Sequence, residues 1–179
     1  MEMMAPGKYI LTGRDDVTIA GAKSKSTFYY PGVRDRNRAK VITVAAGNYV
    51  RDLEIRLPQD EKRYRIAGTV LFSDGFAVKG ATIEFASAEP GYAENTTSNA
   101  DGSFALTALA GVQGQLKVEL PVFLPMLRNC PEWKVGPREQ GMMRFIEAPA
   151  TAITMDEDRI DLTIELPSPS CKAVPAQRP

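Results

Sequence analysis

The chain has 179 residues, enough for one large or two small domains that bury a core. Its 22 Lys and Arg balance its 22 Asp and Glu, and no apolar run reaches the length of a membrane span, so nucleic acid, anionic lipid and a bilayer are not expected partners. The sequence contains no histidine, which argues against Ser-His-Asp or Cys-His catalysis and most zinc sites. We therefore expect a protein that is not an enzyme and has no cofactor.

One block of the sequence occurs twice. Residues 7–11, 41–44 and 52–58 match residues 114–118, 152–155 and 161–167, at offsets of 107, 111 and 109 positions. The stretch 64–111 between the copies occurs once. Internal similarity at a nearly fixed spacing indicates a modular array. We expect residues 1–60 to be the C-terminal half of a β-sandwich module and residues 61–179 to be a complete module with a C-terminal tail.

Short segments of alternating apolar and polar residues, separated by Gly, Pro, Asn and Asp, predict strands throughout the second module. In chain order these strands are residues 65–72, 81–86, 96–99, 103–109, 116–120 and 162–166, and residues 53–57 match the last of them in the first copy. Ala100-Asp101-Gly102 predicts a hairpin turn between the third and fourth. Residues 132–143 contain Gly and Pro and predict a long loop. The pattern favours an all-β, antiparallel β-sandwich over about residues 62–167, with almost no helix.

The turn elements of the second module resemble a known family. They are Ile66–Val70, Asp74-Gly75, Val78–Ile83, Asn99–Phe104 and Leu109–Gly111. Together they are similar to the carboxypeptidase regulatory-like domain over residues 64–120, although residues 113–116 depart from that family's usual Pro-Gly-x-Tyr. The resemblance implies a transthyretin-like (prealbumin-like) sandwich without peptidase activity, in a bacterial multi-module envelope or secreted protein. Residues 7–11 look like the end of a preceding module, and residues 28–32 resemble a segment common in such proteins.

The two cysteines are candidates for a disulfide. Cys130 follows the strand that contains Leu116, and Cys171 lies beyond the last predicted strand. A bond between them would tether the long loop in an oxidising compartment, and two unpaired thiols are the alternative. We favour the disulfide.

Aromatic residues are candidates for ligand binding. Tyr29, Tyr30 and Trp133 could form a flat platform for sugar rings, whereas aromatic residues on strands more commonly pack in a core. The Asp-Gly turns at residues 74–75 and 101–102 could offer oxygens to calcium, but so few carboxylates favour simple turns, and we expect no metal site.

These observations predict a noncatalytic, secreted or cell-envelope module with a structural, adhesion or assembly role. A carbohydrate-binding module is the alternative. The expected partners are other β-sandwich modules or envelope proteins, and possibly glycans. The partial module would leave an apolar face and strand edges to be covered, either by the complete module of the same chain, which we favour, or by a homo-oligomer.

Overall fold

The computed structural model describes residues 4–19, 22–58, 61–88, 91–123, 139–140 and 143–168. Within these ranges the protein has thirteen strands, one short 3₁₀ turn and no α-helix, so the all-β prediction is confirmed. The elements are β1 (Gly7–Tyr9), β2 (Thr12–Ile19), β3 (Ala22–Tyr29), η1 (Arg36–Arg38), β4 (Ile42–Val44), β5 (Arg63–Phe72), β6 (Thr82–Ser87), β7 (Tyr92–Thr97), β8 (Ser103–Leu109), β9 (Gln113–Phe123), β10 (Glu139–Gln140), β11 (Met143–Glu147), β12 (Thr151–Thr154) and β13 (Arg159–Leu166).

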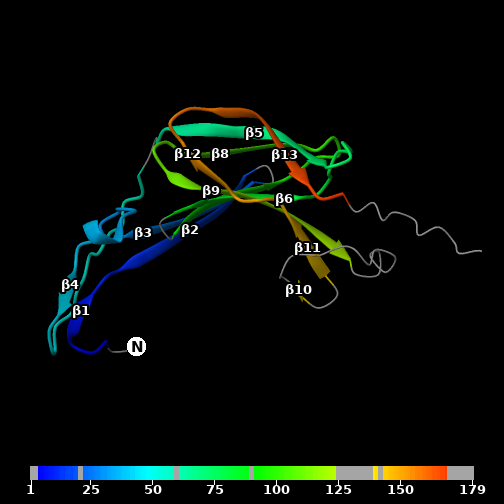
Figure 1. Ribbon diagram of the computed structural model, residues 1–179. Coiled ribbons are helices and arrows are strands. Elements are labelled where there is room, and N and C mark those ends of the chain that lie inside the picture. The colour runs from blue at the N-terminus through cyan, green and yellow to red at the C-terminus, as the bar shows by residue number, and fades with distance from the viewer. Residues whose placement is uncertain are drawn as a thin grey trace, which may run out of the picture.

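The strands from β5 onward, together with β2 and β3, form two layers (Figure 1). One layer is the three-stranded sheet in the order β13-β5-β8. The other is a larger sheet in the order β10-β11-β9-β6-β7-β3-β2, with β12 paired to β9. Because each strand alternates its side chains between two faces, one face of each layer can be apolar and face the other layer.

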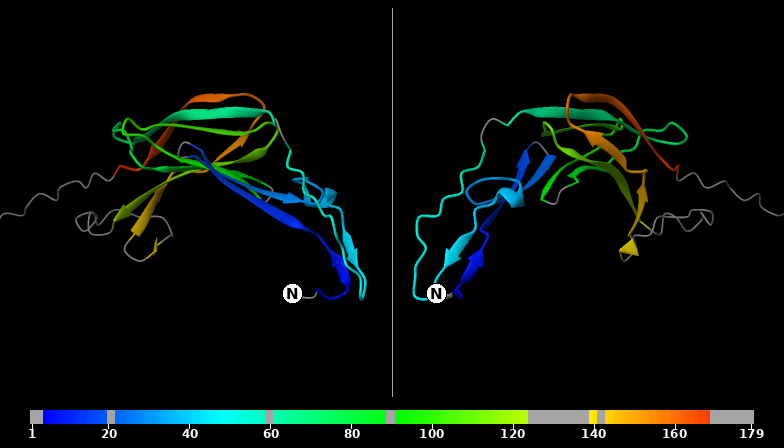
Figure 2. Two further views of the ribbon diagram at one scale, coloured as in Figure 1. Left: turned by 180° about the vertical axis from the view of Figure 1, so that it is seen from behind. Right: turned by 60° about the vertical axis from the view of Figure 1, so that its left-hand side comes forward.

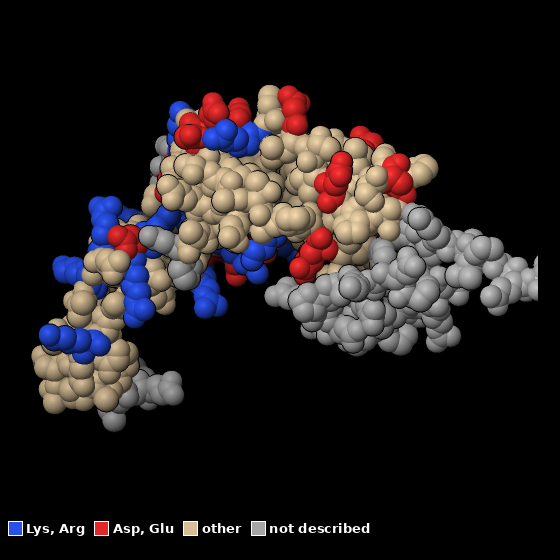
Figure 3. Space-filling model, in the orientation of Figure 1, with Lys and Arg blue, Asp and Glu red and all other residues tan. Residues whose placement is uncertain are grey.

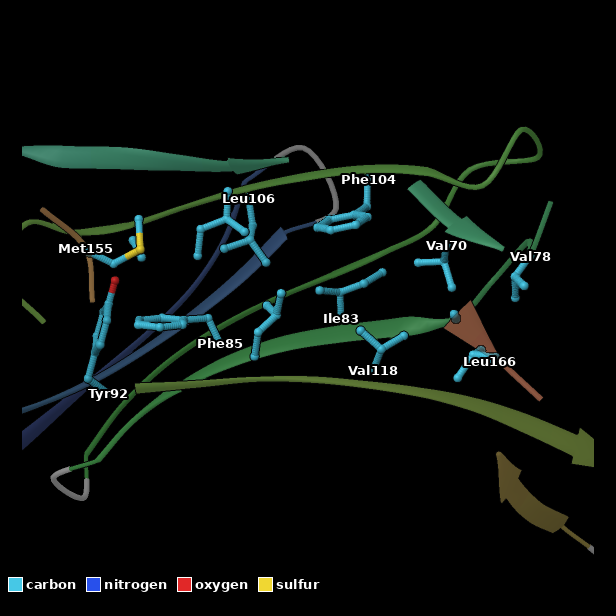
Figure 4. Packing of buried hydrophobic residues seen from close by; sticks show 14 of the residues in the cluster. Val70, Val78, Ile83, Phe85, Tyr92, Phe104, Leu106, Val118, Met155 and Leu166 are labelled. Atoms are coloured by element: carbon cyan, nitrogen blue, oxygen red, sulfur yellow. The ribbon is translucent and has the colours of Figure 1, made fainter. Parts of the chain in front are cut away.

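The core lies between these layers, where side chains from both sheets meet (Figure 4). Ile66 and Val70 of β5 and Ile83 and Phe85 of β6 are fully buried, as the alternation of apolar and polar residues in these segments predicts. Phe72, on the same face of β5 by alternation, is half-buried at the end of the strand. The other buried hydrophobic residues of this cluster are Val78, Ala81, Tyr92, Phe104, Leu106, Ala108, Leu109, Leu116, Val118, Ile146, Met155 and Leu166. Burial of this apolar surface is the main favourable contribution to folding.

The predicted turn at Ala100-Asp101-Gly102 forms, but the strands beside it do not pair as a hairpin. The amide of Gly102 donates to the carbonyl of Asn99 at 3.0 Å, and Gly102 has φ +80°, a conformation that favours glycine. Beyond the turn, β7 pairs with β6 while β8 pairs with β5. The turn therefore carries the chain from one layer of the sandwich to the other.

Asp101 stabilises this turn. Its Oδ1 accepts hydrogen bonds from the Ser103 hydroxyl at 2.7 Å and the Ser103 amide at 3.0 Å, and these bonds lower the pKa of the Asp101 carboxyl. The resulting contribution to stability is present above the carboxylate's ordinary titration range and is lost as pH falls through the lowered pKa.

We expect Ser103→Ala to raise the pKa of Asp101 toward its ordinary value, because the hydroxyl bond is the largest cause of the lowering. An NMR titration of the Asp101 carboxyl carbon in both chains measures this. The same pKa in the variant and the unmodified chain would contradict the assignment.

β13 and β5, the last and first strands of the sandwich, pair in parallel. Six registered pairs run from Arg159↔Ile66 to Leu166↔Phe72, and a bulge interrupts them between Arg159 and Leu162. At this bulge the Leu162 carbonyl oxygen comes within 2.1 Å of where a Cβ on Gly68 would lie. The close approach of the two backbones requires a glycine in β5.

Residues 4–19 and 22–58 form an arm, and its outer part, with β1 and β4, extends away from the sandwich (Figure 2). The β2–β3 hairpin joins the arm to the larger sheet, because β3 pairs with β7 from Lys23↔Asn95 to Ser26↔Tyr92. Farther out, β1 pairs with β4 from Gly7↔Val44 to Tyr9↔Ile42. A continuous sheet thus crosses the boundary expected between the two modules.

Candidate functional site

The first two repeated blocks also recur as paired strands. The third block forms the end of β13 in the second copy, but the strand predicted for residues 53–57 in the first copy does not form. In the second copy β9 pairs with β11 over its distal part and with β12 over its proximal part. In the first copy β2 pairs with β3, and β1 pairs with β4, in the same order along the chain. We call residues 7–57 the first repeat, residues 113–166 the second repeat, and residues 63–109, which carry β5 to β8, the unrepeated half.

One backbone detail recurs at the same point of both repeats. Among the described residues, the non-glycine residues with positive φ are Asp52 at 58° and Asp161 at 62°, which lie 109 positions apart. Asp tolerates the left-handed conformation better than most residues. Asp161 introduces the strand segment Leu162–Leu166, and Asp52 introduces the matching segment Leu53–Leu57.

A polar network fastens the first repeat to the sandwich. Glu94 of β7 is only 4% exposed, and its carboxylate accepts a hydrogen bond from the Ser24 hydroxyl of β3 at 2.9 Å. Arg63 of β5 forms an ion pair with the same carboxylate and donates to the Thr107 carbonyl at 3.1 Å. A buried carboxylate is costly unless it is paired and hydrogen-bonded. The ion pair therefore joins the two layers of the sandwich at Glu94, and the Ser24 hydrogen bond attaches the hairpin to the same carboxylate.

Aromatic rings extend this network. The Tyr92 hydroxyl accepts a hydrogen bond from the Leu109 amide at 2.8 Å, and burial, together with the nearby Glu94 carboxylate, raises the pKa of Tyr92. The Arg34 guanidinium lies over the ring of the buried Phe28, 4.5 Å from its centre. Arg34 Nε also donates to Glu61 Oε1 at 3.0 Å, which ties the segment before β5 to the arm. We call Ser24, Arg34, Arg63, Tyr92 and Glu94 the junction.

The rest of the first repeat lacks the cover that the second repeat has. Leu57 is 47% exposed, whereas the matching Leu166 is fully buried. Tyr9, Leu11 and Val44 are half-buried, while the residues at the matching positions, Leu116, Val118 and Met155, are buried. The outer end of the arm also carries few charged residues on the face shown in Figure 3. We call Leu53, Ile55 and Leu57, with their backbone, the open edge.

The backbone of Arg56, between Ile55 and Leu57, contacts the turn at Pro31 and Gly32. The Arg56 amide donates to the Pro31 carbonyl at 3.0 Å, and the Arg56 carbonyl lies against Gly32, where it would be 1.9 Å from a Cβ. These contacts hold Arg56 against the Pro31-Gly32 turn, and the Ile55 side chain lies 3.6 Å from where a Cβ on Gly13 of β2 would be.

Of the aromatic and cysteine candidates, the structure describes only Tyr29 and Tyr30. Tyr29 and Tyr30 are half-buried at the end of β3, and the Lys40 ammonium lies 6.0 Å from the centre of the Tyr30 ring. Trp133, Cys130 and Cys171 lie outside the described residues, so the platform and the disulfide both stay predictions.

Two further observations concern the described ranges only. They contain no group of three or more His, Cys, Asp or Glu residues placed to hold a metal ion. They also contain no helix whose length and hydropathy would suit a membrane crossing.

Sequence reasoning missed the junction. Glu94 lies on the same inward face of β7 as the buried Tyr92, where alternation predicts an apolar residue. Arg63 and Ser24 lie 31 and 70 positions from it, so no local motif links them. The repeated Asp-Leu-x-Ile-x-Leu-Pro did signal the open edge, because the two copies have matching residues and different surroundings.

Comparison of the chain with models of known families, with curated proteins and with solved structures finds no match.

Proposed function

We propose that this chain is a noncatalytic β-sandwich module of an exported protein and that it serves a structural, adhesion or assembly role. The observation that carries the proposal is the junction. A buried carboxylate, an arginine from the opposite layer and a hydroxyl from the arm hold two successive units in one fixed arrangement. Such a joint suits a protein whose work is to position its neighbours.

The pairing of β3 with β7 supports the same role. Four registered residue pairs continue the sheet of the sandwich into the arm, so the two units share main-chain hydrogen bonds as well as side-chain contacts. Two domains joined only by a flexible linker would lack both. The resemblance of residues 64–120 to carboxypeptidase regulatory-like domains is consistent with export to the cell envelope, and the likeness of fold is a weaker warrant for function than the joint itself.

A glycan array tests this role against carbohydrate binding. We expect the unmodified chain to bind no family of related sugars. The matched control is the double variant Tyr29→Ala/Tyr30→Ala, which removes the two described residues of the predicted aromatic platform. A set of related sugars bound by the unmodified chain would overturn the proposal, and loss of that binding in the double variant would assign it to these tyrosines.

A further inference from the structure

We propose that the edge of β2 that faces away from β3 pairs with the same edge of a second copy of this chain, antiparallel and in a register centred on Asp15. We call this edge the β2 edge. The pairing joins the larger sheets of two copies across a two-fold axis. This inference rests on the assembly role proposed above and names the partner and the surface that it uses.

The backbone groups on the β2 edge can be assigned from the pairing of β2. This strand is the outermost strand of the larger sheet (Figure 1), and among the described residues it pairs with β3 alone. Just before β2, the Tyr30 amide donates to the Leu11 carbonyl at 2.9 Å, so Leu11 and Tyr30 form a hydrogen-bonded pair. Bonded and non-bonded pairs alternate along an antiparallel ladder. The residues of β2 whose backbone groups face away from β3 are therefore Thr12, Arg14, Asp16 and Thr18.

The hydrogen bonds of β3 support this assignment independently. Thr27 lies opposite Arg14, and its amide donates to the Gly91 carbonyl at 2.7 Å. Gly91 immediately precedes β7, which pairs with β3 on the side away from β2. The amide of Thr27 therefore does not bond to β2, as expected for a non-bonded pair. The backbone groups of Arg14 then face the β2 edge.

The sequence of β2 is complementary to itself in the antiparallel direction. Backbone bonding requires that outward-facing residues of both copies lie opposite each other, so the centre of the register falls on a residue. Centring on Asp15 places Thr12 opposite Thr18 of the second copy and Arg14 opposite Asp16 of the second copy, and both pairs recur across the axis. A register centred on Arg14 or Asp16 would instead bring two like charges together at that residue. The charges therefore favour the register on Asp15.

The charges on one face of the joined sheet alternate in this register. Arg14 and Asp16 are exposed, and Asp16 lies opposite Lys25 of β3. In the dimer, each Asp16 lies between Lys25 of its own chain and Arg14 of the second copy. Opposite charges on facing residues stabilise a pair of strands. This charge complementarity identifies a second copy as the partner.

Asp15 limits the strength of the pairing. Its side chain is half-buried and lies on the face of β2 opposite to Arg14 and Asp16, where it meets Asp15 of the second copy at the axis. Facing like charges weaken a strand pair. Charges on an edge strand also keep unrelated strands from pairing with it. The β2 edge thus admits a strand with its own pattern of charges and holds it weakly.

An exchange of charge between two variants tests the register. Arg14→Asp and Asp16→Arg, each in the full chain, should each weaken self-association at least about 10-fold, because each brings like charges together in two pairs. An equal mixture of the two variants should associate about as tightly as the unmodified chain, because the carboxylates of one variant then face the guanidinium groups of the other. Sedimentation equilibrium measures the dissociation constants, and circular dichroism checks that each variant is folded.

A third variant tests the position of the axis. Asp15→Asn should tighten the dimer about 3-fold or more, because it removes the facing like charges. The matched control is Glu165→Gln, which removes an exposed carboxylate from β13 in the other sheet and should leave the dissociation constant unchanged. In NMR amide exchange of the unmodified chain, the Arg14 and Asp16 amides should gain protection as concentration rises. The Asp15 amide, which faces β3, serves as the internal reference.

Several results would overturn the proposal. One is an unmodified chain that stays monomeric at the concentrations used for NMR. Another is a mixture of Arg14→Asp and Asp16→Arg that associates no more tightly than either variant alone. A dimer that leaves exchange at the Arg14 and Asp16 amides unchanged would also overturn it, since another surface would then form the interface. None of these results depends on the glycan array, so the β2 edge can fail as an interface while the broader role stands.

Discussion

Replacing Arg63 with alanine is expected to lower the free energy of unfolding by about 2–4 kcal/mol. The change leaves the Glu94 carboxylate, whose side chain is 5% exposed, with the Ser24 hydroxyl and without its counter-ion. We place the cost below that of breaking a fully buried ion pair because the Arg63 side chain is 36% exposed and water can partly replace it. Urea denaturation followed by circular dichroism measures the change.

Two variants separate the effect of the unpaired buried charge on stability from nonspecific destabilisation. Arg56→Ala removes an ion pair with Glu54 in which both side chains are mostly exposed, and it should cost no more than about 0.5 kcal/mol. Adding Glu94→Gln to Arg63→Ala removes the unpaired charge and should recover part of the lost stability. Equal losses for Arg63→Ala and Arg56→Ala would contradict the role of the junction.

Gly68→Ala is expected to cost about 3 kcal/mol, near the upper end of the usual range for overpacking. The added Cβ would lie 2.1 Å from the Leu162 carbonyl oxygen and 2.8 Å from the Leu162 carbonyl carbon. Both obstacles are backbone atoms in a registered strand pair, so relief requires β13 to move away from β5. Thermal and chemical denaturation of the purified chain would both report the loss.

Gly75→Ala is the matched control. Gly75 has φ +87° and nothing within 4 Å of its Cβ position, so alanine there meets backbone strain alone, about 1 kcal/mol. If Gly68→Ala destabilises the chain no more than Gly75→Ala does, the close approach at the bulge does not matter.

The sequence predicted the parts of the fold in which alternation is clean. Ile66 and Val70, and then Ala81, Ile83 and Phe85, gave the inward faces of β5 and β6 correctly. The hairpin β2–β3 was not predicted, because its strands Thr12–Ile19 and Ala22–Tyr29 carry Arg, Asp, Lys and Ser where a half-buried strand usually has apolar residues. Those charges suit β2, which is the outermost strand of its sheet.

The pairing partners could not be read from the pattern. Residues 96–99 and 103–109 flank a tight turn and suggested a hairpin, yet β7 and β8 belong to different sheets. Periodicity gives the face that a strand buries, but it does not give the neighbour to which the strand bonds. The parallel pairing of β13 with β5 was hidden for the same reason, since it joins residues about 94 positions apart. The repeat indicated an apolar face in need of cover, and we favoured cover by the complete module of the same chain. The exposure of Leu53 at 39% and of Leu57 at 47% shows that the described part of the chain does not provide it.

The parallel pairing of β5 with β13 has a mechanical consequence. The chain enters the sandwich at Arg63 and leaves it after Leu166, and in a parallel pair these two points lie at opposite ends of the ladder. A force that pulls the two ends of the module apart is therefore directed along the strands, and it loads the backbone hydrogen bonds of the ladder together instead of one after another. A module joined in this way resists stretching along the direction in which its neighbours would pull.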